Sequence, residues 1–330
     1  LRRNGIFNAE NHTEKRVNGM SITIHNLTVT FKNKATAIRH ADLEIPGGIY
    51  GLLGENGAGK TTLMRVLTTV LPPTSGTVTM DGIPYCEENY PAIQKQIGYL
   101  PQEIDLYPNL TVQECLEYMG DLSGIPKGRC KERIQYYLEK TSLTEHRKKK
   151  MKQLSGGMKR RVGLVQGLLN DPKFLIVDEP TTGLDPEERI RIRNLLVDFS
   201  ERRTVLFSTH VVEDLVATCN QLAVMKKGRF LYAGSMTALI RQAQGHVWVC
   251  TVSNESEARK IEHQYHISSK QFVNGGLQMK IISPMRPQTD CRPCEATLED
   301  AYLYLSSRRP VSPSAAAAPA GRSAPFLKKR

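Results

Sequence analysis

The chain has 330 residues, of which 40% are hydrophobic and 24% charged, so it is long enough for one large domain or two smaller ones with an adequate core. Its net charge of +12 does not indicate nucleic-acid binding, because six of the excess positive charges lie in an acid-free tail at 308–330 and the rest of the chain shows no basic face. An anionic lipid surface would suit such a tail better.

The cysteines and the hydropathy indicate the cellular compartment in which the protein is expected. An odd number of cysteines, seven, without a signal peptide predicts reduced thiols in a cytosolic protein. Cys291 and Cys294 form a lone C-x-x-C, and no two further ligands at zinc spacing stand out, so a metal or redox role is not favoured. No apolar run approaches the roughly 20 residues that cross a bilayer. If the protein serves a membrane process, we expect another chain to supply the membrane part.

The first half of the chain alternates short strands with helices. Residues 1–19 are polar and unpatterned, and we expect a flexible leader or a cloning remnant there. Apolar runs predict strands at 21–30, 41–45, 49–53, 76–80 and 97–101. The pattern is helical from 111 to 140, with Thr111 as a cap and Pro126 in a break.

The second half continues this alternation and then changes character. Helices are expected at 154–169 and 186–200, and strands at 174–178 and 204–209, with a hairpin at 222–232. After Gln244-Gly245 the pattern predicts strands at 247–252, 272–273 and 277–282, and helices at 256–264 and 296–305. The last 20 or so residues are rich in Ala, Pro and Ser, which predicts disorder.

Residues 54–61, Gly-Glu-Asn-Gly-Ala-Gly-Lys-Thr, match the phosphate-binding pattern G-x-x-x-x-G-K-[ST] between a predicted strand and a predicted helix. Glycines let backbone N–H groups approach phosphate, and the following helix directs its dipole at the same place. Lys60 can reach the β- and γ-phosphates, and the Thr61 hydroxyl can ligate Mg²⁺. An ordinary glycine turn is the alternative, which the filled pattern disfavours. The residues expected to bind the nucleotide here are Gly54, Glu55, Asn56, Gly57, Ala58, Gly59, Lys60, Thr61 and Thr62.

Two acids end the apolar strand at 174–178. Asp178 stands where a Walker B carboxylate binds Mg²⁺ directly or through water. Glu179 follows it and can orient the attacking water or accept its proton. The alternative is a solvated turn, which the order of these motifs disfavours.

One further segment, Leu154-Ser155-Gly156-Gly157, indicates which family of nucleotide-binding proteins the chain resembles. With this segment the chain resembles the ATP-binding subunit of an ABC transporter over about residues 21–235. The resemblance implies that Ser155 and Gly157 contact the γ-phosphate held by the opposite subunit of a dimer, and that Gly156 allows the close approach. Read without the other motifs, the same residues would be a helix cap.

The resemblance assigns further residues. Gln102 is similar to the Q-loop glutamine, which senses Mg²⁺ and the membrane partner, and Asp185 to the D-loop acid at the dimer interface. His210 is similar to the switch histidine, which holds the γ-phosphate and supports Glu179. Phe31 is similar to the aromatic residue that stacks on adenine, with core packing as its alternative.

The implied fold is α/β: a P-loop NTPase of ABC type with an antiparallel β subdomain, a helical subdomain and a small C-terminal α+β unit. The expected domains are a leader at 1–19, an ATPase domain at 20–240 with its helical subdomain at about 103–160, an accessory α+β domain at 246–306 and a disordered basic tail at 307–330. Met158 and the Leu298-Glu299-Asp300 segment resemble exporters of drugs, antibiotics or lipids whose membrane subunits are separate chains.

The sequence therefore predicts a Mg²⁺-dependent ATPase subunit that powers an ABC transporter, with ATP and Mg²⁺ as cofactors. The expected partners are an integral membrane permease subunit, which would dock at 106–125, and a second ATP-binding subunit in a homodimer or heterodimer. The expected location is the cytoplasmic face of the cell membrane. The alternative is a soluble ABC ATPase acting on ribosomes or DNA. It is disfavoured because the chain has one such domain. It also has no long insertion between the phosphate-binding loop at 54–61 and the signature, Leu154-Ser155-Gly156-Gly157.

Overall fold

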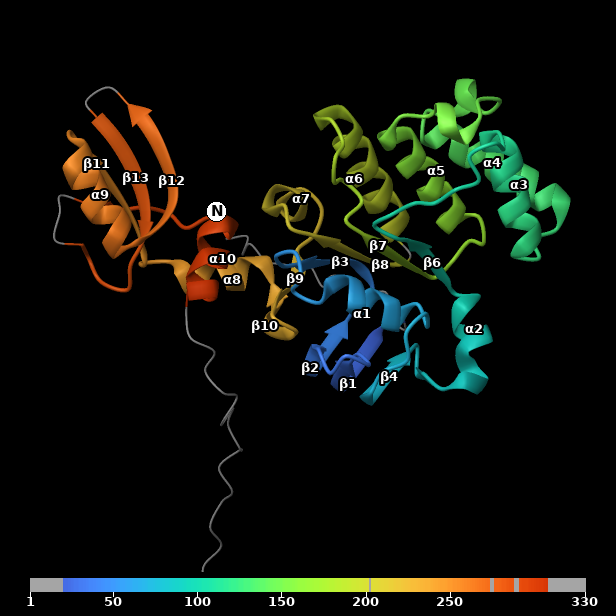
Figure 1. The fold of residues 1–330 in the computed structure, drawn as a ribbon, viewed down its shortest axis with the longest axis horizontal. Coiled ribbons are helices and arrows are strands. Elements are labelled where there is room, and N and C mark those ends of the chain that lie inside the picture. Colours follow the sequence, from blue (N-terminus) through green and yellow to red (C-terminus); the bar gives the residue numbers. More distant parts are fainter. Residues whose placement is uncertain (1–19, 202, 274–275, 288–290, 308–330) are drawn as a thin grey trace, which may run out of the picture.

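Figure 1 shows the fold in a computed structural model, which describes residues 20–307 except 202, 274–275 and 288–290. The expected leader at 1–19 and the tail from 308 onward lie outside the described residues. Three sheets organise the chain, two of them antiparallel and one mainly parallel. None of the helices in the described ranges combines the length and apolar character that a bilayer span requires.

The first sheet is antiparallel and lies beside helix α1 (Figure 1). In spatial order it contains β2 (Thr36–Ile45), β1 (Ile22–Thr30), β4 (Ser75–Met80) and β5 (Ile83–Pro84). β2 begins at Thr36, before the predicted residue 41. The earlier start was not predicted because irregularities in the pairing with β1 break the alternation of apolar side chains. The bulged stretch contains Asn26 and His40, both at φ +47°.

The central sheet has five parallel strands and one antiparallel edge strand. In spatial order they are β10 (Arg229–Ser235), β9 (Gln221–Lys226), β3 (Gly48–Leu53), β8 (Thr204–Thr209), β7 (Phe174–Asp178) and β6 (Ile97–Leu100). β7 and β8 are buried at every residue, which explains why they read as continuous apolar runs rather than alternating ones. Their carboxyl ends meet at one edge, where ligands bind in open α/β sheets.

Helices cover both faces of the central sheet (Figure 1). One hydrophobic cluster fills the space between this sheet, α1 and the first antiparallel sheet, and a second lies on the opposite face. Between residues 60 and 243, the helices outside the helical subdomain are α1 (Lys60–Leu67), α2 (Tyr90–Gln94), α6 (Pro186–Ser200), α7 (Val212–Val216) and α8 (Met236–Ala243), with a short 3-10 turn, η1, at Glu87–Asn89. α7 and α8 were not predicted: five residues are too few to establish a helical period in α7, whereas in α8 the apolar spacing of Met236, Leu239, Ile240 and Ala243 was overlooked.

A third cluster forms the core of the helical subdomain. Its elements are α3 (Val112–Leu122), α4 (Lys127–Lys140), α5 (Gly156–Leu168) and the 3-10 turns η2 (Thr144–His146) and η3 (Met151–Gln153). Thr111 caps α3 in a reciprocal capping box with Glu114, and Pro126 stands just before α4, as predicted. The structure therefore confirms an α/β fold with an antiparallel sheet and a helical subdomain.

The C-terminal part forms a third, antiparallel sheet with a helix against it. The strands, in spatial order, are β12 (His266–Val273), β13 (Gly276–Ile282), β11 (Val247–Val252) and β14 (Cys291–Pro293), and the helices are α9 (Glu255–Gln264) and α10 (Leu298–Ser307). α10 turns back and packs against α8, so that Leu298, Ala301 and Tyr304 share a hydrophobic cluster with the central sheet. The C-terminal unit is therefore joined to the central sheet through a common core.

The expectation that all cysteines are reduced thiols is wrong for two of them. Cys250 of β11 and Cys291 of β14 form a disulfide. The antiparallel register places them directly opposite one another with Cα atoms 4.3 Å apart. β14 has only three residues and no strand was predicted there, so the pairing of cysteines separated by 41 positions was not foreseeable. Cys291 and Cys294 consequently do not act as a dithiol pair, and Cys294 is a free thiol.

The link between α10 and the third sheet generates a test of stability. Asp300, which is 1% exposed, accepts hydrogen bonds from the Lys280 ammonium at 2.6 Å and from the Thr297 amide at 2.8 Å. Burial opposes ionisation, but these bonds outweigh it and hold the pKa of Asp300 below its usual range. A carboxyl group with a lowered pKa in the folded state stabilises the fold above its unfolded pKa, and this contribution disappears as the pH falls through the folded pKa.

Asp300→Asn should therefore lower the free energy of unfolding at pH 7 by about 1–3 kcal/mol, the range for hydrogen bonds to charged groups. The loss should shrink as the pH falls below about 4, where the parent carboxyl group also becomes protonated. Urea unfolding at several pH values measures both effects. Glu299→Gln, at an exposed neighbouring acid, is the control and should change stability by less than about 0.5 kcal/mol. A loss independent of pH would contradict the role of the charge.

Candidate functional site

A cleft of about 500 Å³ opens where the phosphate-binding loop (residues 54–61) joins β3 to α1. Most of the residues predicted to bind nucleotide line it: Phe31, Glu55, Asn56, Gly57, Gly59, Lys60, Thr61, Thr62 and Gln102, together with Glu179 and the unpredicted Ala37. Phe31 is 40% exposed at its rim, which makes the alternative of core packing wrong for this side chain. Gly54 and Ala58 lie in the same loop behind the lining.

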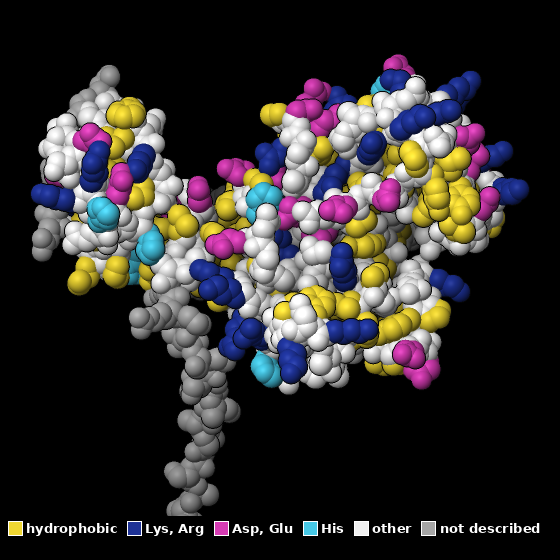
Figure 2. All heavy atoms as spheres, viewed as in Figure 1, with side chains coloured by type: hydrophobic (Ala, Val, Ile, Leu, Met, Phe, Trp, Pro, Cys, Tyr) yellow, Lys and Arg dark blue, Asp and Glu magenta, His cyan; other side chains and the backbone are white. Residues whose placement is uncertain are grey.

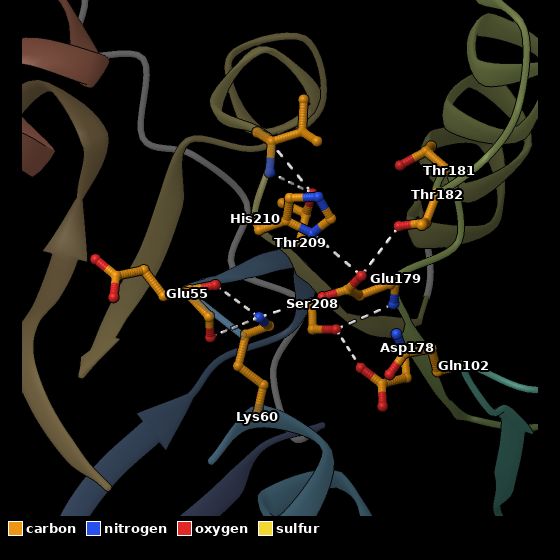
Figure 3. Close-up of polar contacts among 12 residues, drawn as sticks. Glu55, Lys60, Gln102, Asp178, Glu179, Thr181, Thr182, Ser208, Thr209 and His210 are labelled. Carbon is orange, nitrogen blue, oxygen red and sulfur yellow. Dashed lines mark hydrogen bonds and ion pairs between the residues drawn. The ribbon is translucent and has the colours of Figure 1, made fainter. Parts of the chain in front are cut away.

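The Lys60 ammonium lies at the base of this cleft. Lys60 is only 5% exposed, and its ammonium donates to the carbonyl oxygens of Gly54 at 2.6 Å and Glu55 at 3.3 Å. The ammonium also lies 3.2 Å from Glu179 Oε1 (Figure 3). Lysine carries its charge on a flexible stem, so a polyanion entering the cleft can replace these contacts. The geometry suits the recognition of phosphate oxygens.

Glu179 stands one residue beyond β7 and is 3% exposed. Its second carboxylate oxygen is 3.1 Å from His210 Nδ1 and accepts a hydrogen bond from Thr182 Oγ1 at 3.0 Å (Figure 3). Burial alone would raise the pKa of Glu179, but the charge of Lys60 and the hydrogen bonds from His210 and Thr182 hold the pKa below its usual range. The group is therefore a carboxylate at neutral pH, as a proton acceptor must be.

The backbone of Glu179 has an unusual conformation. Its φ of +48° lies in the left-handed region, which few residues other than glycine adopt. Strained backbone of this kind concentrates at functional sites, where surrounding contacts hold it. Here the Glu179 amide donates to Ser208 Oγ at 3.0 Å on the neighbouring strand, and the side chain faces Lys60 and His210 rather than continuing the strand.

Asp178, fully buried at the end of β7, has two different carboxylate oxygens. Ser208 Oγ donates to Oδ1 (Figure 3). Oδ2 is buried and makes no hydrogen bond to any part of the chain that the structure describes. An unsatisfied buried carboxylate oxygen is costly unless something electropositive comes to it. Asp178 is not among the cleft-lining residues of the described chain, but this free oxygen leaves it able to serve a cation next to Glu179.

The remaining predicted residues lie elsewhere. Ser155 caps α5 by accepting from the Met158 amide at 3.2 Å, with Gly156 and Gly157 in the first turn of that helix. Asp185 caps α6 by accepting from the Glu188 amide at 2.9 Å. None of these four residues is among those that line the cleft of the described chain. Within one chain, then, the signature and the phosphate-binding loop are separate.

Comparisons with known proteins agree with this arrangement. Residues 39–182 match the family model described as ABC transporter. An uncharacterized ABC transporter ATP-binding protein of Bacillus subtilis is 40% identical over 68% of this chain and 73% of its own length. A Nod factor export ATP-binding protein of Paraburkholderia xenovorans is 39% identical over 80% of this chain and 89% of its own. The chain belongs to the family of ABC transporter ATP-binding proteins.

Solved structures extend this to fold and activity. A dimeric bacterial ABC transporter cassette, 25% identical, covers 65% of this chain and 98% of its own with a TM-score of 0.60. The same cassette is known as a dimer in a post-hydrolysis state with ADP and phosphate. This chain is accordingly an ATP-binding subunit of an ABC transporter and an ATPase, and we refer to it as the cassette. Nothing in these similarities supports the ribosome or DNA alternative.

The loop glycines of the cassette are required partly for a reason that sequence analysis did not give. We expected glycine because phosphate must approach the backbone closely. In the structure, a Cβ at Gly54 would stand 2.5 Å from the carbonyl oxygen of Met225, and one at Gly59 would stand 2.7 Å from that of Ala37. Gly59 also has a φ of +109°, which disfavours any other residue. These two glycines therefore let the loop pack against β9 and β2.

Sequence analysis missed the residue that fixes the inner wall of the cleft. Arg160 of α5 is 8% exposed and donates to the carbonyl oxygens of Gln102 at 2.6 Å and Asp178 at 3.1 Å. It also donates to the carbonyls of Glu179 and Pro180. One guanidinium thus ties the segment after β6 to the segment after β7. In the sequence, Arg160 is simply a basic residue two positions after Met158, and basic residues are common on the solvated face of any helix.

Ser208 gives a test of how the buried acid is held. Ser208→Ala removes the hydroxyl that serves both Asp178 Oδ1 and the Glu179 amide, leaving a buried charge without a partner. We expect the free energy of unfolding to fall by about 1–3 kcal/mol, the cost of an unsatisfied buried group. Chemical denaturation measures it. The matched control is Ser200→Ala, whose hydroxyl donates to the Val197 carbonyl at the exposed end of α6 and should cost less than about 0.5 kcal/mol. Equal effects at both serines would contradict this role.

Proposed function

We propose that the cassette powers export, and that Lys60, Glu179 and His210 carry out its ATP hydrolysis. The observation that supports the catalytic assignment most directly is the chain of contacts from the buried Lys60 through the buried Glu179, both of which line the cleft, to the exposed His210. Export is supported by relatives whose names describe Nod factor export and linearmycin resistance, the latter 38% identical over 68% of its length.

In this proposal, hydrolysis depends on positioning and electrostatic stabilisation. Lys60 and the backbone N–H groups of residues 54–61 hold the β- and γ-phosphates. Glu179 orients the attacking water and accepts its proton, for which its lowered pKa keeps it ionised. His210 contacts the γ-phosphate and keeps Glu179 in place. Phe31, at the rim, stacks on adenine.

The side chains present suit Mg²⁺. The metal prefers oxygen ligands and keeps several waters, so a few protein oxygens near the phosphates are enough. The unpartnered Asp178 Oδ2, the Thr61 hydroxyl and the Gln102 side chain would hold it. When bound, Mg²⁺ neutralises charge on the β- and γ-phosphate oxygens. Ser208 orients Asp178 for this task, as residues behind a metal ligand commonly do.

The active unit in this proposal is a dimer, either of two copies or with a homologue. Ser155, Gly156, Gly157 and Asp185 lie outside the cleft of their own chain, and a second subunit would bring its copies of them to the γ-phosphate. The dimeric state of the similar bacterial cassette supports this arrangement. ATP would then close the dimer, and hydrolysis would reopen it.

We propose that a separate integral membrane permease docks on the helical subdomain, which places the cassette on the cytoplasmic face of the membrane. Hydrophobic side chains gather on this subdomain in Figure 2. Within the predicted docking segment, Tyr107 and Tyr118 are 48% and 42% exposed with rings in edge-to-face contact at 5.2 Å, and Leu122 is 63% exposed. Exposed aromatic side chains of this kind are typical anchors of interfaces.

Glu179→Gln tests the catalytic assignment. The amide keeps the shape of the side chain but cannot accept a proton, so turnover should fall by roughly 10²-fold or more while ATP still binds. A closed ATP-bound dimer should accumulate, because reopening requires hydrolysis. Phosphate release and sedimentation measure the two effects. Glu201→Gln, at an exposed acid just after α6, is the control and should hydrolyse ATP at the parent rate. Near-normal turnover of Glu179→Gln would refute the role of Glu179.

Ser155→Arg tests the composite site. It puts bulk and positive charge where a small hydroxyl should meet the γ-phosphate, but leaves Lys60 and Asp178 untouched. We expect nearly unchanged ATP binding to the monomer and no ATP-driven dimerisation or cooperative hydrolysis. Because Ser155 also caps α5, the matched control is Ser235→Arg, which removes a cap of the same kind from α8, with the same 3.2 Å bond, away from the cleft.

Mixing Ser155→Arg with Lys60→Ala sharpens this test. Each mixed dimer has one site damaged on both sides and one site with both halves intact, so part of the hydrolysis should return. Neither variant alone should show this partial return of ATP hydrolysis. If Ser155→Arg hydrolyses ATP as a monomer at the parent rate, the composite site is wrong.

A further inference from the structure

Helix α10 contacts both the accessory sheet and the phosphate-binding loop. On one side, Asp300 pairs with Lys280 of β13 at 2.6 Å. On the other, the Tyr302 hydroxyl donates to Glu55 Oε1 at 3.4 Å, across 247 positions of sequence. One helix thus joins the C-terminal sheet to the loop that would hold the nucleotide phosphates.

The end of α10 is also fixed. The Lys226 ammonium of β9 donates to the carbonyl of Ser306 at 3.0 Å, and Ala301 and Tyr304 are buried in the cluster shared with the central sheet. Tyr302 is half-buried and packs against that cluster. Because the helix is held on several sides, its tyrosine hydroxyl has a defined position relative to the loop.

Glu55 is an unusual residue for its place. The other features of the loop attract anions: backbone N–H groups, a helix N-terminus and the Lys60 ammonium. Glu55 lines the same cleft and carries a negative charge, which would repel a triphosphate within the screening length of about 8 Å at physiological salt. In Figure 3 its carboxylate points away from Lys60, whereas its carbonyl oxygen faces Lys60. The hydrogen bond from Tyr302 lies on this outer carboxylate.

Tyr302 is suited to act as a donor. Burial and the neighbouring Glu55 charge raise the pKa of its hydroxyl, so the group stays protonated at neutral pH. The hydroxyl therefore acts as the donor and the Glu55 carboxylate as the acceptor of a long contact, 3.4 Å, whose role is to orient the carboxylate.

We propose that Tyr302 is a positioning residue for nucleotide binding: it holds the Glu55 carboxylate turned away from the triphosphate, and α10 thereby links the accessory unit to ATP affinity. This inference rests on the proposed ATP site at residues 54–61. Without the Tyr302 hydroxyl, the carboxylate is free to turn towards Lys60 and compete with the phosphates for that charge.

A double-mutant cycle tests the link. In the full chain, Tyr302→Phe keeps the packed ring and removes only the hydroxyl, and Glu55→Gln removes the charge that the hydroxyl holds. We expect Tyr302→Phe to weaken binding of a fluorescent ATP analogue by roughly two- to tenfold, which is the lower part of the range of coupling between contacting residues. In the Glu55→Gln background the same substitution should have no effect. The loss should also shrink at 1 M salt, since it is electrostatic.

Two reference variants make the result decisive. Tyr232→Phe, which removes a hydroxyl that donates to the Ser235 carbonyl in the same cluster, should bind the analogue like the parent. Lys60→Ala should weaken binding by about tenfold or more, which tests the site itself. If Lys60→Ala weakens binding and Tyr302→Phe does not, the positioning role is overturned and the site stands. An equal loss from Tyr302→Phe with and without the Glu55 charge would also overturn it, because a purely structural effect would ignore that charge. Unchanged binding by Lys60→Ala would refute the site on which the inference depends.

Discussion

The site depends on the register of three buried parallel strands. β3 pairs with β8 so that Leu53 lies opposite Thr209, and β7 pairs with β8 so that Asp178 lies opposite Ser208. This alignment ends all three strands at one edge. It brings Glu179 into contact with both Lys60 and His210, which are distant from it in the sequence. A shift by one residue would turn every side chain of a strand to the opposite face and dissolve the constellation.

Holding these charges together out of water has a cost that the Lys60–Glu179 ion pair offsets in part. Lys60 and Glu179 line the cleft, and Arg160 and Asp178 are buried next to Glu179, so that the formal charges of the four residues cancel. Removing one member of such a set leaves an uncompensated buried charge, which is far more destabilising than the net value of the pair. Arg160 adds rigidity because it binds backbone carbonyls, not the acidic side chains, and so leaves the carboxylates available to a ligand.

The sequence was informative wherever ligand chemistry restricts residue type, and silent wherever only the tertiary structure does. Phosphate and water activation prescribe glycines, a lysine and acids at fixed spacing, so Lys60 and Glu179 could be predicted. Arg160 could not, since a basic residue on a helix is ordinarily solvated and only the packing of α5 against the strand ends buries it. The Cys250–Cys291 disulfide depends on the register of a three-residue strand. The link from Tyr302 to Glu55 depends on α10 folding back on α8.

The separation of the signature from the cleft has a consequence for symmetry. α1 and α5 each begin next to glycine, and each presents its unpaired N–H groups at one end. Within one chain these two helix ends serve different places, so a single subunit offers only one of them to a given triphosphate. A two-fold interface is self-complementary. Where a residue of one subunit contacts the loop of its partner, the same residue of the partner contacts the loop of the first subunit. In the proposed dimer of two copies, two equivalent sites would therefore form at once, and closure would depend on nucleotide in both.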